Sequence, residues 1–181
     1  INFLQAGVSS SDMITTVSPT YAHEIQTAEG GFGMDGLLRA RTDVIKGILN
    51  GADLRQWNPE IDKKIPETYS ARSMAGKAKC KEELQKKMGL EVNPDIPVIG
   101  IVTRLVDQKG IAEIFAPTYG SIYQICTDMK VQFAILGSGE SWCENEICAL
   151  QSKLPNLRAY IGYDDALSHL IEAGSDFFLM P

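Results

Sequence analysis

No apolar stretch in the sequence approaches the roughly 18–20 residues that a membrane-spanning helix needs, so no membrane segment is expected. Runs of positive charge are also missing. The 17 Lys and Arg residues are outnumbered by 23 Asp and Glu residues, and the net charge of −6 argues against nonspecific binding to nucleic acids. Histidine is scarce: only His23 and His169 occur, far apart in the sequence, and no metal site is predicted.

Closely paired cysteines are absent as well. The four cysteines form no CxxC pair and are predicted to be reduced thiols, as in a cytosolic protein: Cys80, Cys126, Cys143 and Cys148. The chain opens INFLQAG, without an initiator Met or a signal peptide, and it ends in the apolar run FFLMP. We interpret it as an internal fragment of a longer protein. Its 181 residues, 44% of them hydrophobic, suffice for one globular domain or for one domain with part of a second.

The first half of the chain alternates short elements with glycine-rich turns. The pattern predicts a strand over 13–18, a helix from 19 to about 26, a loop over 29–36, a helix over 37–44, a strand over 47–49, an extended connector over 56–69 and a charged helix over 73–88. Ser18 suits the N-cap of the first helix and Pro19 its first position, while Gly89 suits the end of the last helix. The lysines of the charged helix are interpreted as a solvated face rather than a binding patch: Lys77, Lys79, Lys81, Lys86 and Lys87.

The second half alternates continuous apolar runs with helical segments. Strands are predicted over 97–103, 131–136, 157–161 and 176–180, with helices over 110–129, 140–153 and 164–173 between them. Pro117 and Gly120 are expected to break the first of these helices. The order β-α-β-α-β-α-β predicts an α/β fold with a parallel sheet and helices on its faces.

Two cations follow the first predicted strand of this half. Because ligands of open parallel sheets bind outside the carboxyl ends of the strands, the loops at those ends are the candidate site. Arg104 and Lys109 lie five residues apart in one such loop. Near a helix N-terminus they would suit a diphosphate, and the alternative is that both are solvated loop residues.

Glycines and an aromatic residue follow the next two strands. Gly137 and Gly139 flank Ser138 at a strand-to-helix corner, where glycine either lets a ligand approach the backbone or serves the turn alone. Tyr163 either stacks on a nucleobase or packs on its own sheet, and Asp164 suits the N-cap of the next helix.

Seven strings along the chain resemble the glycogen/starch synthase family in the right order. They are TTVSPTYAHEIQT, GMDGLLRAR, GILNGADLRQWNP, KCKEELQKKMGL, GIVTRLVDQKG, AILGSGE and IGYDDALSHLIEAGSDFFLMP. The resemblance implies part of a GT-B architecture, with two Rossmann-like domains. Residues 1–49 would be the end of the N-terminal acceptor-side domain, 50–69 the hinge and connector, and 70–181 the first half of the C-terminal nucleotide-binding domain.

The resemblance also implies an activity. The family transfers glucose from ADP-glucose, or in some eukaryotes UDP-glucose, to the non-reducing end of an α-1,4-glucan, with retention of configuration. No cofactor or metal is expected. The implied partners are the nucleotide sugar, the glucan acceptor and the rest of the parent chain, with no nucleic acid and no membrane. The expected location is the cytoplasm, or the plastid stroma if the source is a plant or alga.

Residue roles carry over on matching motifs. Arg104 and Lys109 match the pair that binds the diphosphate and stabilises the leaving group, so both are the predicted catalytic residues. Tyr163 matches the residue that stacks on the base, and Asn50 matches the hinge Asn near the sugar pocket. Gly137 and Gly139 match the backbone turn near the nucleotide. Ser18, Pro19 and Tyr21 match a family signature, in which we interpret Pro19 and Tyr21 as structural. His169 matches a helix position of the family and is also interpreted as structural.

Two family segments are not among these 181 residues: the Lys-rich donor loop and the segment with the essential Glu. The fragment by itself is therefore expected to be inactive. Two alternatives remain. One is a non-catalytic homologue of the same fold that binds nucleotide or glucan, and the other is a sugar-nucleotide epimerase.

Overall fold

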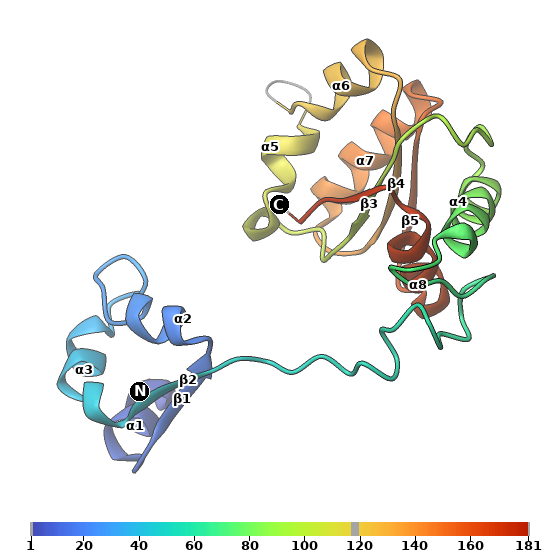
Figure 1. The fold of residues 1–181 in the computed structure, drawn as a ribbon. Coiled ribbons are helices and arrows are strands. Elements are labelled where there is room, and N and C mark those ends of the chain that lie inside the picture. The colour runs from blue at the N-terminus through green and yellow to red at the C-terminus, as the bar shows by residue number, and fades with distance from the viewer. Residues whose placement is uncertain (1, 117–119, 181) are drawn as a thin grey trace. The chain divides into compact units, whose positions relative to one another are not determined.

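The computed structural model describes residues 2–116 and 120–180. The chain divides into two compact units, Ile1–Asp53 and Leu54–Pro181 (Figure 1). The division falls inside the predicted hinge region of 50–69. The assignment of the units to an acceptor-side and a nucleotide-side domain stays a prediction.

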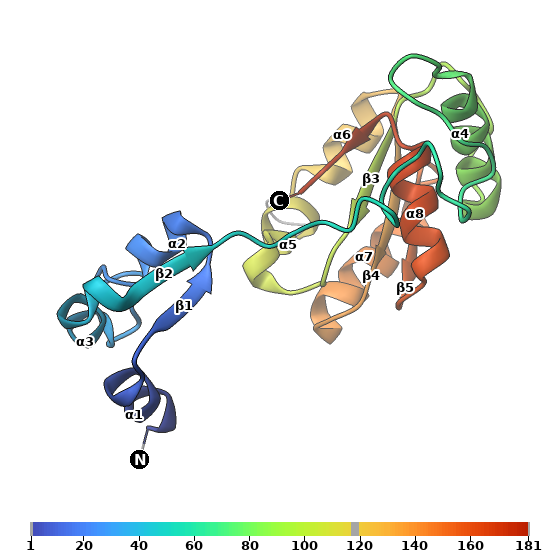
Figure 2. The same ribbon diagram turned by 60° about the horizontal axis from the view of Figure 1, so that its bottom comes forward.

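The first unit is a small α/β assembly. Its elements are α1 Phe3–Ser10, β1 Ile14–Val17, α2 Pro19–Glu24, α3 Asp35–Ala40, η1 Thr42–Val44 and β2 Ile45–Ile48. The two strands are parallel neighbours (Figure 2), with Ile14 opposite Ile45, so the second strand begins two residues before its predicted start. The Ser18 hydroxyl accepts a hydrogen bond from the Tyr21 N–H at 3.2 Å, which confirms the predicted cap of α2.

The second unit is built on a parallel sheet, as predicted. Its strands are β3 Val98–Val102, β4 Gln132–Gly137, β5 Leu157–Ile161 and β6 Phe177–Phe178, and its helices are α4 Ala75–Met88, η2 Asp107–Lys109, α5 Ile111–Phe115, α6 Ile122–Asp128, α7 Ser141–Lys153 and α8 Asp165–Gly174. The strand order is β5-β4-β3-β6, and every pair is parallel. The strands β4 and β5 follow on one side of β3, and β6 pairs with its other side. The topological switch point therefore lies between β3 and β6.

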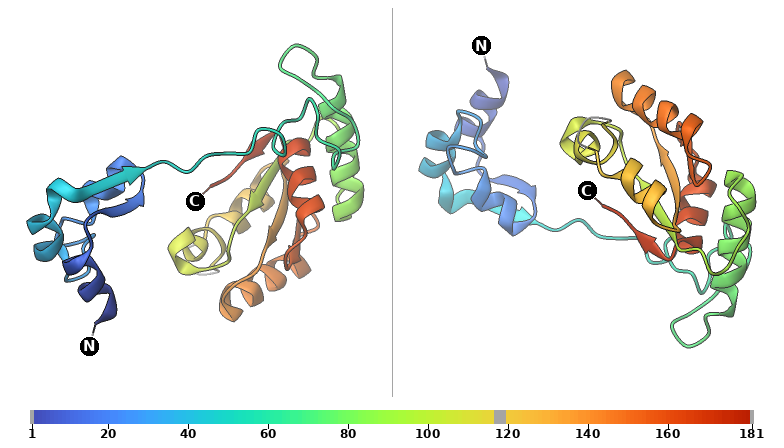
Figure 3. Two further views of the ribbon diagram at one scale, coloured as in Figure 1. Left: turned by 90° about the horizontal axis from the view of Figure 1, so that it is seen from below. Right: turned by 90° about the horizontal axis from the view of Figure 1, so that it is seen from above.

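Helices cover both faces of this sheet. In Figure 3, α4 and α8 lie on one face and α5, α6 and α7 on the other. Leu84, Leu167 and Ile171 form the core on the first face, while Phe133 and Ile147 belong to the core on the second. A strand buried on both sides reads as a continuous apolar run, and all six residues of β4 are buried.

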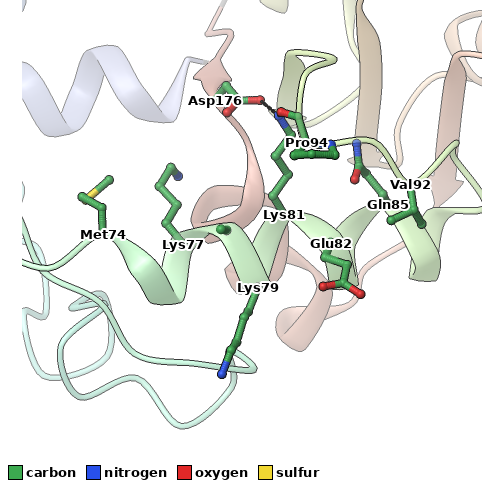
Figure 4. Close-up of a pocket in the computed structure, with 10 residues that line it drawn as sticks. Met74, Lys77, Lys79, Lys81, Glu82, Gln85, Val92, Pro94 and Asp176 are labelled. Atoms are coloured by element: carbon green, nitrogen blue, oxygen red, sulfur yellow. Dashed lines mark hydrogen bonds and ion pairs between the residues drawn. The ribbon is translucent and has the colours of Figure 1, made fainter.

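The solvated-face interpretation is wrong for two of the five lysines of α4. Lys81 is only 8% exposed, and its ammonium lies 2.8 Å from both an Asp176 carboxylate oxygen and the Pro94 carbonyl (Figure 4). The Lys77 ammonium donates to the Ala173 carbonyl at 2.8 Å. The helix α4 packs against α8, and the two ammonium groups reach polar groups at the C-terminal end of α8 or just beyond it.

The break in the helix after Gly110 is where it was expected. The first piece, α5, ends at Phe115 and the second, α6, begins at Ile122. Gly120 lies in this break, while Pro117 falls outside the described residues. All four cysteines are free, as predicted. Within residues 2–116 and 120–180, no helix is both long and apolar enough to cross a bilayer.

Candidate functional site

The candidate site lies at the carboxyl ends of β3, β4 and β5. Strand pairing continues past the ends of β3 and β4. The Leu105 N–H donates to the Ser138 carbonyl at 3.0 Å, and the Glu140 N–H donates to the Leu105 carbonyl at 2.8 Å. The Leu105 side chain is fully buried and belongs to the core. The structure therefore brings the loop of Arg104 beside the loop of Gly137 and Gly139.

The glycines of the second loop make this close approach possible. A Cβ added at Gly137 would lie 2.1 Å from the Thr103 carbonyl oxygen, and one at Gly139 would lie 2.2 Å from the Leu105 carbonyl oxygen. Both separations are far below van der Waals contact. Packing of the two loops thus accounts for both glycines. Their predicted part in nucleotide binding stays a prediction.

The two predicted cations are available for an anion. Arg104 is exposed and Lys109 is half-buried at the end of η2, just before Gly110 with its left-handed φ of 65°. Neither side chain has a hydrogen-bond or ion-pair partner among the described residues. Two unpaired cations follow β3, one of the two strands that flank the switch point, where open α/β sheets bind their ligands.

The carboxylates of the neighbouring loop have partners of their own. One Glu144 oxygen accepts the Gly139 N–H at 2.9 Å, and one Glu140 oxygen accepts the Trp142 indole N–H at 2.6 Å. These bonds fix the turn that leads from β4 into α7. Neither of these two carboxylates forms an ion pair with Arg104 or Lys109.

Tyr163 stands at the same edge, after β5. The Gly162 N–H donates to the Gly137 carbonyl at 2.8 Å, which joins this loop to the one after β4. The Tyr163 side chain is 85% exposed, so the alternative in which it packs on its own sheet is wrong. Asp164 caps α8 as predicted, since its carboxylate accepts the Leu167 N–H at 2.8 Å. An exposed ring on a fixed loop is suited to stacking.

Asn50 lies outside the unit that holds these residues. It is exposed and belongs to the first unit, Ile1–Asp53, as do Ser18, Pro19 and Tyr21. The other five predicted site residues belong to the second unit. The role of Asn50 near a sugar pocket therefore stays a prediction.

The sequence did not predict the contacts that surround His169. His169 is 2% exposed, in agreement with its structural interpretation, and its Nδ1 lies 2.6 Å from an Asp62 carboxylate oxygen. The Trp57 ring stacks on the imidazole with centroids 3.9 Å apart and planes 11° from parallel. Burial raises the pKa of Glu172, which lies one turn further along α8. The partners come from a connector without periodicity, so only the need of a buried histidine for a partner would have signalled them.

The groove drawn in Figure 4 lies away from the candidate site. It has a volume of about 450 Å³ and runs beside α4, past Met74, Val92 and Asp176. The Asp176 carboxylate accepts the Val98 N–H at 2.7 Å, at the start of β3. The groove thus lies near the amino ends of the strands, at the end opposite the candidate site, and it is not a candidate for the nucleotide.

Comparison with known proteins connects this geometry to a family. Residues 1–40 match the family described as the starch synthase catalytic domain. The glycogen synthases of Treponema denticola and Myxococcus xanthus are 58% identical over 181 residues and 49% identical over 182 residues, in each case over 100% of this chain and 37% of the relative. The catalytic domain of starch synthase IV from Arabidopsis thaliana, bound to ADP and acarbose, superposes with a TM-score of 0.90 and 36% identity, over 100% of this chain and 37% of that one. The chain spans a little over a third of the length of these proteins.

Proposed function

We propose that this chain is part of a glycosyltransferase of the glycogen and starch synthase family, whose members it resembles in sequence and fold along its whole length. In this proposal, the chain is part of an enzyme that transfers glucose from ADP-glucose to the non-reducing end of an α-1,4-glucan, with retention of configuration. The similarity to two glycogen synthases over 100% of the chain supports this reading.

The observation that carries the proposal is the pair of unpartnered cations after β3. When the bond between glucose and the diphosphate breaks, negative charge develops on the leaving oxygen. Arg104 presents a planar fork that fits two phosphate oxygens, and Lys109 supplies a compact charge. Fixed cations that meet the charge as it develops lower the barrier, because they bind the transition state more tightly than the ground state.

The remaining predicted site residues take supporting roles. Tyr163 stacks on the nucleobase, because its ring is exposed on a loop that is hydrogen-bonded to the one after β4. Gly137 and Gly139 keep that second loop close to the diphosphate-binding loop. Asn50 contacts the sugar side of the donor. In this scheme the charge of the diphosphate is neutralised by side chains, without a metal ion.

The choice of ADP-glucose over UDP-glucose has a separate basis. The starch synthase IV structure that this chain resembles holds ADP. Adenine also offers a larger ring system than uracil for stacking on Tyr163. A donor preference for ADP-glucose follows, and UDP-glucose is the alternative to be tested beside it.

A chimeric enzyme tests the proposal. Residues 1–181 replace the matching segment of the Treponema denticola glycogen synthase, which is 58% identical over this length. We expect the purified chimera to extend a maltooligosaccharide with ADP-glucose, at a higher rate than with UDP-glucose. The variant Lys130→Ala, an exposed lysine outside the site, serves as the control for charge removal and should keep the rate. A folded chimera that binds ADP but transfers no glucose would support the non-catalytic alternative.

A further inference from the structure

Tyr163 lies between two neighbours that are held in place by hydrogen bonds. Before it, the Gly162 N–H donates to the Gly137 carbonyl at 2.8 Å. After it, the Asp164 carboxylate accepts the Leu167 N–H at 2.8 Å and caps α8. Because Tyr163 is 85% exposed, the direction of its ring depends on this backbone more than on packing around the ring.

Gly162 has a backbone conformation that few other residues adopt. Its φ of 149° lies in the range that favours glycine, because a Cβ crowds the backbone there. The space beside it is also occupied. A Cβ added at Gly162 would lie 3.0 Å from Cε1 of the Tyr160 ring, and 3.6 and 3.8 Å from its Cδ1 and Cζ. The ring of Tyr160, a residue of β5, thus lies on the side of Gly162 where a larger residue would have its side chain.

A change in the φ angle of Gly162 would be absorbed at Tyr163. Rotation about this bond swings every atom that follows it in the chain. The helix α8 cannot follow, because Leu167, Leu170 and Ile171 are buried in the core that joins it to the sheet. Tyr163 is the first residue between the rotated bond and this helix, so the rotation would change the direction of its ring.

We propose that Gly162 is a positioning residue for the nucleobase of the donor: its conformation, held by the Gly137 carbonyl and by the ring of Tyr160, aims the Tyr163 ring at the base. This role rests on the proposed function, in which Tyr163 stacks on that base. Stacking of a base on an aromatic side chain raises affinity by about 5- to 150-fold. Gly162 acts on this share of donor binding alone, through Tyr163, and leaves the binding of the diphosphate unchanged.

The backbone part of this role is tested in the 181-residue chain, without any ligand. Gly162→Ala brings a methyl group against the Tyr160 ring and disfavours the present φ. We expect the protection of the residue-162 amide against hydrogen exchange, measured by NMR, to fall by about tenfold or more, while the Leu167 amide keeps its protection. An unchanged residue-162 amide would overturn the proposal.

Gly89→Ala is the matched control for the loss of a glycine. Gly89 also has a positive φ, of 67°, and nothing lies within 4 Å of its added Cβ. It ends α4, outside the candidate site. This variant carries a similar backbone strain and should leave the residue-162 amide as it is.

The binding part is tested in the chimera with two ligands, ADP and ribose 5-diphosphate, which lacks the base. We expect Tyr163→Ala and Gly162→Ala each to raise the Kd for ADP by about tenfold and to leave the Kd for ribose 5-diphosphate unchanged. When Tyr163→Ala is already present, adding Gly162→Ala should change the Kd for ADP by less than about twofold, because both substitutions act through the same ring. Gly89→Ala should keep the Kd of both ligands.

The outcomes separate this role from the proposed function. Losses of affinity for both ligands, or losses that multiply in the double variant, would mean that Gly162 acts through the loop after β4, to which it is hydrogen-bonded, and would overturn its positioning role. An unchanged Kd for ADP in Tyr163→Ala would instead overturn the stacking that the proposed function assigns to Tyr163, and the role of Gly162 with it.

Discussion

Replacing Gly139 with alanine tests whether the loops after β3 and β4 are held together as tightly as their geometry indicates. The new Cβ would lie 2.2 Å from the carbonyl oxygen of Leu105 and 2.6 Å from its carbonyl carbon. Backbone atoms cannot turn aside as the end of a flexible side chain can. The Leu105 side chain is fully buried, so the loop cannot move outward without disturbing the core of the second unit.

The size of the effect follows from what must move. To reach an ordinary contact distance, the two loops must separate by roughly 1.3–1.8 Å. Overpacking of this kind costs about 1–3 kcal/mol. The separation also stretches the Leu105–Ser138 and Glu140–Leu105 hydrogen bonds, now 3.0 and 2.8 Å long, and each is worth about 0.5–1.5 kcal/mol. Together these contributions predict a loss of about 2–6 kcal/mol in the free energy of unfolding of the second unit.

Urea unfolding followed by the fluorescence of Trp142, at the start of α7, measures this loss. Gly36→Ala is the matched control, because nothing lies within 4 Å of its added Cβ and alanine favours the helix α3. The control belongs to the first unit and should leave the Trp142 transition where it is. If Gly139→Ala also left this transition unmoved, the loops would be looser than their hydrogen bonds indicate and our account of the glycines would fail.

The remaining predictions concern the cations and the thiols. In the chimera, Arg104→Ala and Lys109→Ala should each lower kcat by about 10²–10³, with Lys109→Arg only partly effective, because one preorganised donor to the leaving group is lost; near-normal steady-state kinetics would place the diphosphate elsewhere. Lys81→Ala should lower the free energy of unfolding by about 1–3 kcal/mol in urea melts, since its partly exposed carboxylate partner Asp176 loses its cation and the buried stem of the lysine is removed, and a loss below about 0.5 kcal/mol would contradict this. The native chain should react rapidly with a thiol reagent only at Cys148, the one exposed cysteine, whereas Cys126 is buried and burial raises its pKa to about 11. Because the unfolded thiol releases its proton nearer its ordinary pKa of 9.0, Cys126 should make stability fall as the pH rises above that value; mass spectrometry counts the labelled thiols and melts at pH 8 and 10 measure the loss.

The strands and turns of the second unit could be predicted because each depends on local chemistry. The run VQFAIL predicted a strand buried on both faces, and β4 is such a strand. Gly89 predicted the end of α4 and adopts the left-handed conformation there, with φ 67°. The loops of Arg104, Gly137 and Tyr163 were expected at one sheet edge because parallel strands end together, and they are joined there by backbone hydrogen bonds.

The contacts that could not be predicted join residues far apart in the sequence. The lysines of α4 look alike in the sequence, yet Lys81 is buried and Lys79 is exposed. Only tertiary contacts distinguish them, because Lys81 reaches Asp176 and Pro94. His169 and Asp62 are 107 residues apart, and no periodicity marks the connector. Such pairs depend on tertiary structure, which local patterns do not encode.

The loops at the carboxyl edge are held to one another by main-chain groups, from Leu105 to Ser138 and from Gly162 to Gly137. Main-chain hydrogen bonds do not depend on which side chain a position carries. The backbone path of these loops therefore does not depend on the side chains that they carry. Positions such as Ser138 and Tyr163 can be substituted while the loops keep their paths. Under the proposed function, donor preference can then be changed by point substitution at these positions without a new backbone and with little cost in stability.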